Sequence, residues 1–223
     1  MIQIIECEQG SPEWFAARAG IPTASEFHTV MAVGKQGGKS VQRVAYLNKL
    51  VGEILTGEPM ESYSNGDMER GKLMEDEARD LYAFTHGIEP ERVGFVRNGE
   101  KGASPDSLIG DKGGLEIKSA AAHIQVARLL DGGLPSEHKA QVQGNLWLAE
   151  REWWDFVSYS PRLPLFVKRV QRDDGYIATL AGAVNQFNEE LAAEIERIRG
   201  YGEPVPSTME MLQASAYELG GVA

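Results

Sequence analysis

The sequence contains little of what disulfide-stabilised, zinc-dependent and membrane-spanning proteins require. Its single cysteine, Cys7, excludes an internal disulfide framework and a paired-cysteine zinc site. No apolar run approaches the ~20 residues that a membrane-spanning helix needs, and from Met1-Ile2-Gln3 we expect no signal peptide. We interpret the four scattered histidines as ordinary surface or capping residues: His28, His86, His123 and His138. These absences predict a soluble protein with no membrane partner, which is by default cytoplasmic.

Positive charge is also in deficit. The 22 lysines and arginines face 33 aspartates and glutamates, so the formal net charge is −11 at pH 7. Proteins that bind DNA passively carry basic surfaces, because phosphate neutralisation dominates their affinity. The acidity therefore counts against tight nonspecific DNA binding. It still allows a protein whose carboxylates cluster around a metal and whose basic residues line the path of an anionic substrate.

The 223 residues fit one domain with a sizeable core, and no internal repeat or low-complexity linker divides them. We expect a single domain over residues 1–200. Beyond Gly200, the Pro204-Val205-Pro206 step begins a C-terminal tail over residues 201–223.

Capping residues and apolar spacing predict an α/β fold, with a central mixed sheet flanked by helices. Ser11-Pro12-Glu13 begins the first helix and Gly20 ends it, and a second, short helix begins at Thr23 or Ala24. Further helices are predicted over residues 41–55, 123–130, 136–149 and 176–199. Another runs from a cap at Ser64 or Asn65 to about residue 85. The strand candidates are residues 93–97, 107–109, 115–118, 153–159 and 165–170.

The residues with the clearest chemical meaning are Ser104-Pro105-Asp106 and Leu115-Glu116-Ile117-Lys118. Because alternate side chains of a strand point to the same face, Glu116 and Lys118 share one face while Leu115 and Ile117 point into a core. Mg²⁺ prefers hard oxygen ligands and bridges one or two carboxylates to substrate phosphates. A lysine beside it can orient water or offset developing charge. The pattern indicates phosphodiester chemistry, although a solvated Glu/Lys pair on a surface hairpin is the commoner fate of such a triplet.

Strand geometry favours Asp106 over Asp111 as the partner of Glu116. Directly opposed residues of antiparallel strands point to the same face, and the two aspartates differ in parity, so only one of them can join Glu116 in an unbulged register. A loop with an odd number of residues, such as Lys112-Gly113-Gly114, selects Asp106, whereas a two-residue loop selects Asp111. Pro105 forces an extended approach to Asp106. We therefore predict Asp106.

Other motifs accompany the hairpin in order, from about residue 8 to about residue 161: Trp14 to Arg18 with Gly20 and Thr23-Ala24-Ser25-Glu26; Gly71-Lys72 with Glu75 and Ala78-Arg79; and Ala140-Gln141-Val142-Gln143 with Trp147. With the hairpin, which resembles the PD-(D/E)xK nuclease signature, this set resembles the phage-type alkaline exonucleases typified by bacteriophage lambda exonuclease, the YqaJ-like recombinases. The chain departs from that pattern where Ser107, in place of an expected glycine, follows Asp106. The C-terminal segment has no match.

The resemblance implies a restriction-endonuclease-like core and a single exonuclease domain. It implies a Mg²⁺-dependent enzyme that digests double-stranded DNA from an end in the 5′→3′ direction. Such an enzyme releases 5′-mononucleotides and leaves 3′ single strands for phage-type recombination by annealing. It further implies two Mg²⁺ ions per site, replaceable by Mn²⁺. The implied partners are DNA ends, a single-strand annealing recombinase and two further copies of the chain in a homotrimeric ring, in the cytoplasm of a bacterial host.

The resemblance also implies roles for the hairpin residues. Asp106 and Glu116, with the main-chain carbonyl of Ile117, hold the metal, and Lys118 positions water. Because lysine has a reference pKa of ~10.4, it is a poor base unless its site lowers that pKa, so we give Lys118 an electrostatic role first.

Two helical residues join the site by the same resemblance. Glu75 becomes a third acid that orients the water, whereas from the residues alone an ion pair with Arg79 at i+4 is the first choice. Gln141 steadies the water or the lysine. Residues i and i+2 lie far apart around a helix, so only one of Gln141 and Gln143 can face the cleft. A polar residue at a helix edge remains an evenly weighted alternative for Gln141.

The resemblance places a 5′-terminal phosphate of DNA at Arg18, Ser25 and Ser104. Arginine grips phosphate with two parallel donors, and hydroxyl groups add hydrogen bonds without charge. The alternative is that Arg18 caps the C-terminus of its own helix and Ser25 caps the next helix. For Ser25, the sequence alone favours this alternative.

Two other functions remain open. An endonuclease of the same superfamily, of restriction or repair type, would use the same residues but would cut a closed circle. A non-catalytic DNA-binding recombination scaffold with a decayed site is the second, and the intact Asp106, Glu116 and Lys118 count against it.

Overall fold

The computed structural model describes residues 1–35, 37–60, 66–202, 204 and 208–209, without the side chains of residues 66–70 and 72. Its larger sheet is mixed and has the strand order β4 (Ser107–Ile109), β5 (Gly113–Ser119), β6 (Trp153–Tyr159) and β7 (Phe166–Gln171). The pair β5–β6 is parallel and its neighbours are antiparallel. A parallel pair needs a long crossover, which here contains α5 (Ala122–Asp131) and α6 (Ser136–Leu148).

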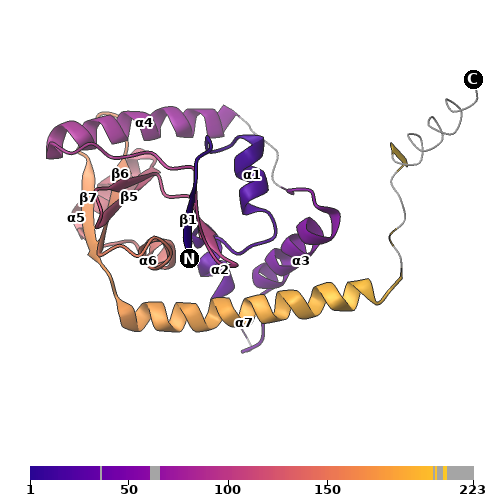
Figure 1. Cartoon of the computed structure of the whole chain (residues 1–223). Coiled ribbons are helices and arrows are strands. Elements are labelled where there is room, and N and C mark those ends of the chain that lie inside the picture. Colours follow the sequence, from indigo (N-terminus) through magenta and orange to yellow (C-terminus); the bar gives the residue numbers. More distant parts are fainter. Residues whose placement is uncertain (36, 61–65, 203, 205–207, 210–223) are drawn as a thin grey trace, which may run out of the picture.

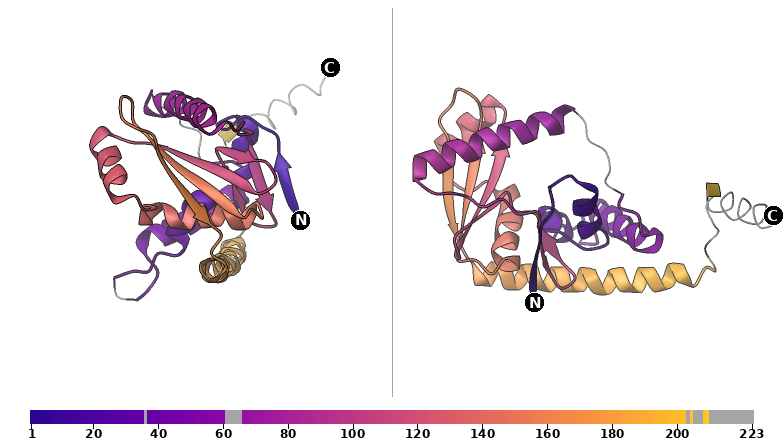
Figure 2. Two further views of the ribbon diagram at one scale, coloured as in Figure 1. Left: turned by 90° about the vertical axis from the view of Figure 1, so that its left-hand side faces the viewer. Right: turned by 45° about the horizontal axis from the view of Figure 1, so that its top comes forward.

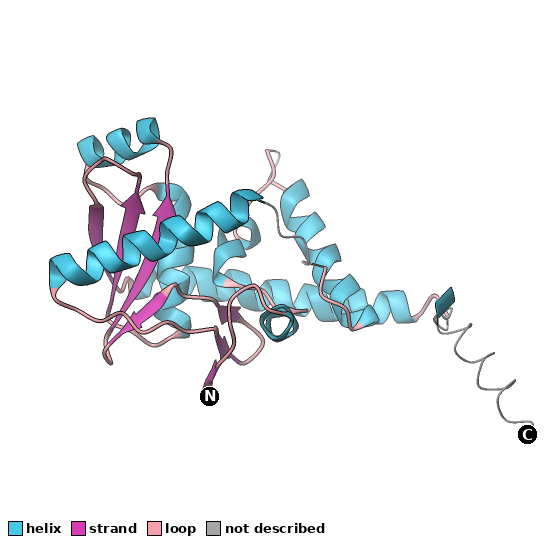
Figure 3. Ribbon diagram, turned by 90° about the horizontal axis from the view of Figure 1, so that it is seen from above, coloured by secondary structure: helices cyan, strands magenta, loops and turns pink. Residues whose placement is uncertain are grey.

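Helices cover both faces of this sheet (Figures 1 and 3). On one face, α4 (Gly66–His86) packs Ala78 and Tyr82 against Leu115, Ile117 and Val157. On the other face, α6 and the beginning of α7 (Asp174–Arg199) enclose a cluster with these members: Leu108, Val142, Leu146, Trp154, Phe156, Phe166 and Ile177. The two faces of β5 therefore meet different helices.

A smaller antiparallel sheet joins β1 (Ile2–Ile5), β2 (Phe95–Asn98) and β3 (Gly102–Ala103). Beside it lie α1 (Pro12–Arg18), the 3₁₀ helix η1 (Ala24–Glu26), α2 (Phe27–Val30) and α3 (Val41–Thr56). This arrangement brings the N-terminal segment next to the strand that leads to Asp106.

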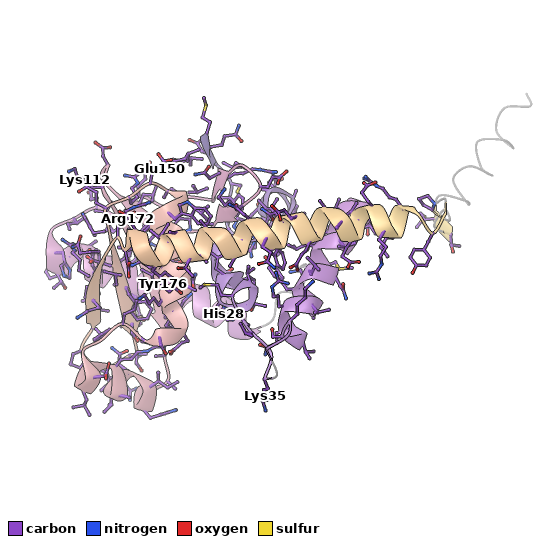
Figure 4. The ribbon with its side chains drawn as sticks, turned by 90° about the horizontal axis from the view of Figure 1, so that it is seen from below. His28, Lys35, Lys112, Glu150, Arg172 and Tyr176 are labelled. Carbon is purple, nitrogen blue, oxygen red and sulfur yellow. The ribbon has the colours of Figure 1, made fainter. Side chains whose placement is uncertain are left out.

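The long helix α7 runs along the side of the molecule opposite α4 (Figure 2). Its apolar stripe, which includes Leu180, Val184 and Phe187, packs in the third core cluster with residues of α2, α3 and α6. In the view from below, Tyr176 lies near the beginning of α7 and Lys35 projects from the loop after α2 (Figure 4). The Tyr176 hydroxyl donates to the sulfur of Met31, which fixes the first turn of α7 against α2.

The α/β class with a mixed sheet between helices is confirmed, and the predicted elements lie within a few residues of the observed ones. The Ser11 side chain caps α1 by accepting from the backbone N–H of Trp14. The short strands β1 and β3 were not predicted: β1 pairs with a strand that is distant in sequence, and β3 consists of only Gly102 and Ala103 in a hairpin with β2. The predicted caps Ser64 and Asn65 and most of the tail lie outside the described residues. Within the described part of the chain, no helix is both long and apolar enough to cross a bilayer.

The prediction of Lys112-Gly113-Gly114 as the hairpin loop is wrong. The loop is residues 110–112, and both glycines belong to β5. Each glycine faces an indole ring of the neighbouring strand: a Cβ on Gly113 would lie 2.3 Å from the Trp153 ring, and a Cβ on Gly114 would lie 2.3 Å from the Trp154 ring. The glycine pair therefore makes room for tryptophans and does not form the turn.

We expect Gly114→Ala to destabilise the protein by about 1–3 kcal/mol, because the fully buried Trp154 cannot move aside without strain. The free energy of unfolding in urea measures the change. Gly182→Ala is the control, since a Cβ at this position of α7 meets nothing within 4 Å. That variant should gain up to about 1 kcal/mol. Equal stabilities of the two variants would contradict the packing argument.

Candidate active site

The β4–β5 hairpin brings Asp106 to Glu116. Ser107 is directly opposite Leu115 in the ladder, so the same register places Asp106 opposite Glu116. The carboxylate of Asp106 also accepts a hydrogen bond from the backbone N–H of Ile117, 2.5 Å away. The parity argument is therefore confirmed, although the odd-numbered loop consists of different residues.

Glu116 is buried at the centre of the site, with only 1% of its side chain exposed. One carboxylate oxygen accepts from Gln141 and pairs with the Lys118 ammonium, each at 2.6 Å, and the other oxygen accepts from Asn145 at 2.9 Å. Three donors fix the orientation of this carboxylate.

Lys118 lies on the same face as Glu116, as the strand alternation predicts, and about a third of its side chain is exposed. Burial by itself favours the neutral amine, but the negative charges of Glu116 and Asp106 outweigh it and raise the pKa of Lys118 above its usual value. Lys118 is therefore an ammonium ion at neutral pH and a source of positive charge in the site.

Helix α6 supplies the amides that hold Glu116. Gln141 faces the site, while Gln143 points elsewhere, donating to the carbonyl of Gln171 and accepting from the N–H of Asp173. Asn145, one turn after Gln141, was not predicted. Its i+4 spacing from Gln141 on an otherwise apolar stretch was the available signal.

Glu75 of α4 lines the cavity that also contacts Asp106, and it makes the predicted ion pair with Arg79 at i+4. The Arg79 guanidinium, 6% exposed, pairs with Glu75 and Asp76 and donates to the Ser107 hydroxyl. Burial raises the pKa of Glu75; Arg79 opposes this effect and the charge of Glu116 adds to it. Ser107, the departure from the expected glycine, is fully buried and anchors the arginine that positions Glu75.

The carboxylates of the site repel one another. Burial and the charges of Glu116 and Glu75 raise the pKa of Asp106 well above its usual value, against the opposing effect of Lys118. Within the described residues, no group of three or more His, Cys, Asp or Glu side chains is close enough to hold a metal by itself. The fit to Mg²⁺ rests instead on two hard carboxylates with excess negative charge, and on the main-chain carbonyl of Ile117 between Glu116 and Lys118.

An open cavity of about 680 Å³ adjoins Asp106 and Glu75. Its charged lining is mainly acidic, with seven carboxylate residues and three arginines: Glu6, Glu8, Glu75, Asp76, Glu91, Asp106 and Asp111, with Arg79, Arg92 and Arg151. This side of the site favours cations over a polyanion.

The N-terminal segment contacts the strand that leads to Asp106. The Gln9 amide donates to the carbonyls of Val93 and Pro105, at 3.0 and 2.9 Å, and the Trp14 indole donates to the Ser104 hydroxyl at 2.9 Å. Two side chains thus hold the two residues that precede Asp106.

The three predicted phosphate-binding residues lie around this contact. The Arg18 guanidinium stacks on the Trp14 ring, 4.0 Å from its centroid, so Trp14 touches both Arg18 and Ser104. The Ser25 hydroxyl lies 3.2 Å from that of Thr23, which forms a β-bridge with Gly102 near Ser104. The alternative in which Ser25 caps the next helix is not observed, because Thr23 occupies the cap position of η1.

Comparisons with known proteins agree with this geometry. Residues 13–152 match the model of the YqaJ-like viral recombinase domain. The structure is similar to that of an alkaline exonuclease, LHK-Exo, from Laribacter hongkongensis, which has also been solved in complex with dAMP. The identity is 36%, the TM-score is 0.77, and the match covers 86% of this chain and 97% of LHK-Exo.

Two further relatives are more distant. A phage-related exonuclease from Haemophilus somnus 129PT is 16% identical with a TM-score of 0.60, over 80% of this chain and 96% of that one, and so shares the fold. The Escherichia coli K12 protein ExoD is 28% identical over 68 residues, which are 29% of this chain and 78% of ExoD.

Proposed function

Because the chain belongs to the YqaJ-like viral recombinase family, we propose that it is a Mg²⁺-dependent 5′→3′ exonuclease of double-stranded DNA. It releases 5′-mononucleotides and leaves 3′ single strands for homologous recombination by annealing. The observation that carries the proposal is the convergence of Asp106, Glu116 and Lys118 on one hairpin. The match to an alkaline exonuclease supports a nuclease over a non-catalytic scaffold.

Asp106, Glu116 and the carbonyl of Ile117 would hold Mg²⁺. The same oxygen ligands suit a second Mg²⁺ ion, and Mn²⁺ could replace Mg²⁺. When bound, the metal supplies a Lewis acid that activates water and stabilises the leaving oxygen. Gln141 and Asn145 keep the Glu116 carboxylate in one orientation.

The residues around the metal ligands complete the mechanism. The Lys118 ammonium offsets the negative charge that builds on the scissile phosphate. Glu75, whose pKa is raised by burial, orients the attacking water in line with the leaving group and can accept its proton. Arg79 keeps Glu75 in place.

The experiment that tests this function incubates linear and covalently closed circular duplexes of the same sequence with the protein and Mg²⁺. An end-dependent exonuclease should convert the linear DNA to mononucleotides and single strands and leave the circle intact. Cutting of the circle would instead establish the endonuclease alternative. Selective labelling of either strand end reads out the polarity.

We expect a duplex with 5′-phosphate ends to be digested about tenfold faster than one with 5′-hydroxyl ends, because Arg18, Ser25 and Ser104 would bind the phosphate. Arg18→Ala should narrow this difference. Arg97→Ala, which removes a half-buried arginine from β2, serves as the control and should preserve the difference. Equal rates on both ends with the wild-type protein would show that the pocket does not exist.

A homotrimeric ring with DNA through its centre would explain how an acidic protein retains its substrate, and closed cyclic symmetry is the usual outcome of heterologous contacts. Sedimentation at micromolar concentration is expected to give three times the 24.4 kDa chain mass. A monomer mass would exclude the ring.

We further propose that the enzyme acts in the cytoplasm of a bacterial host, together with a single-strand annealing protein.

A further inference from the structure

Arg128 of α5 is a largely buried cation without a close carboxylate. Other buried arginines of the described residues have one: Arg43 pairs with Glu190, and Arg79 with Glu75 and Asp76. The side chain of Arg128 is 12% exposed, yet its nearest carboxylate, that of the exposed Glu137, lies 4.0 Å away. Burying a charge is costly unless an opposite charge compensates for it.

The close contacts of Arg128 are with neutral groups. It donates to the Ser158 hydroxyl at 2.8 Å and lies 3.1 Å from Nε2 of His138. A guanidinium has no acceptor, so His138 Nε2 must accept and the imidazole must be neutral. Burial and the positive charges of Lys118 and Arg128 lower the pKa of His138 to about 4, against the weaker effect of Glu137. Interpreting His138 as an ordinary surface residue is therefore wrong.

This pair lies beside the catalytic hairpin. Ser158 is directly opposite Lys118 in the parallel β5–β6 ladder, so their side chains share the sheet face that also carries Glu116. His138, Gln141 and Asn145 follow one another at helical spacing along α6. The polar stripe of α6 thus runs from the buried Glu116 to Arg128 of α5, the helix that follows β5 (Figure 1).

We propose that Arg128 contacts a DNA backbone phosphate next to the scissile phosphate. In this proposal His138 orients the guanidinium of Arg128 without cancelling its positive charge. A neutral acceptor leaves most of the positive charge available to the substrate, because the exposed Glu137, 4.0 Å away, offsets only part of it, whereas a carboxylate in the place of His138 would neutralise it. The acidic cavity beside Asp106 disfavours the DNA backbone on the other side of the site. This inference rests on the proposed function and names one cationic group through which an acidic nuclease can contact DNA.

The test exchanges the acceptor and keeps the arginine. His138→Glu keeps an acceptor for Arg128 but adds a negative charge, and His138→Gln keeps a neutral acceptor. The readouts are binding of a fluorescent 5′-phosphorylated, phosphorothioate-protected duplex in Mg²⁺ between 50 and 200 mM salt, and kcat and KM on the unprotected duplex. A protein that loses one phosphate contact should lose about 0.9 from the slope of log affinity against log salt.

We expect His138→Glu and Arg128→Gln to bind roughly tenfold more weakly, with the lower slope and a raised KM but little change in kcat. His138→Gln and Arg128→Lys should recover most of the affinity. Asn185→Asp, which adds the same charge on an exposed position of α7, controls for net charge. A purely structural Arg128 would instead tolerate His138→Glu, because the new ion pair preserves its contacts.

Two results separate the possible failures. If the wild-type protein shows no salt-dependent affinity for the duplex, the proposed function fails. If the wild type binds but His138→Glu and Arg128→Gln keep its slope and KM, the phosphate contact of Arg128 is overturned. If His138→Glu does not fold, the comparison of Arg128→Lys with Arg128→Gln decides. Only the glutamine variant should show the reduced slope of log affinity against log salt.

Discussion

Lys118→Ala is expected to lower kcat for nucleotide release by about 10²–10³-fold, the usual cost of removing one preorganised group that stabilises charge in a transition state. The ammonium lies 2.6 Å from the Glu116 carboxylate and stays protonated at neutral pH, so its role is electrostatic. KM should change much less than kcat, because the charge that Lys118 offsets develops only during the reaction.

Lys112→Ala is the matched control, because Lys112 lies in the loop of the same hairpin and pairs with Glu152 at the exposed surface. Steady-state kinetics on a 5′-phosphorylated duplex compares the two variants, and circular dichroism checks their folds. Near-normal turnover of Lys118→Ala at neutral pH would refute the assigned mechanism.

Asp106→Asn should abolish nucleotide release and weaken metal binding by more than about 100-fold, the upper range for groups that merely support a ligand. Wild-type release should likewise stop when Mg²⁺ is chelated and return when Mg²⁺ or Mn²⁺ is added back. Burial and neighbouring carboxylates raise the pKa of Asp106. Because a metal ligand must be deprotonated, wild-type metal affinity should increase as the pH rises through that pKa, with release of a proton.

Titration calorimetry with Mn²⁺, in two buffers of different ionisation enthalpy, measures both the affinity and the released proton. Asp111→Asn is the control, since Asp111 is an exposed aspartate of the same hairpin. Its affinity and proton release should match the wild type. A metal affinity that does not change with pH, or nucleotide release that continues after full chelation of Mg²⁺, would show that Asp106 is not a metal ligand.

The hairpin shows what the sequence could and could not predict. Strand parity is a local rule, and it correctly selected Asp106 opposite Glu116. The position of the turn was wrong, because Gly113 and Gly114 resemble turn residues in sequence. Glycine is required at both positions because a Cβ there would clash with Trp153 and Trp154. These tryptophans are about 40 positions later and become neighbours only when β5 and β6 pair.

The support around Glu116 follows the same division. Gln141 was found through its motif, whereas Asn145 could have been found only by extending the helical spacing by one turn. The pairing of Arg128 with His138 could not be read from the sequence, since it depends on how α5 and α6 lie over the sheet. Rules of local geometry located the hairpin carboxylates, and tertiary packing determined what holds them.

The contacts of Gln9 and Trp14 with the residues before Asp106 bear on how this protein can be engineered. A protein trimmed of its first fourteen residues would retain Asp106, Glu116 and Lys118, yet it would lose both side chains that anchor Ser104 and Pro105. N-terminal truncations should therefore stop before Gln9, because Gln9 and Trp14, about ninety residues away in sequence, hold the segment that leads into the hairpin with Asp106.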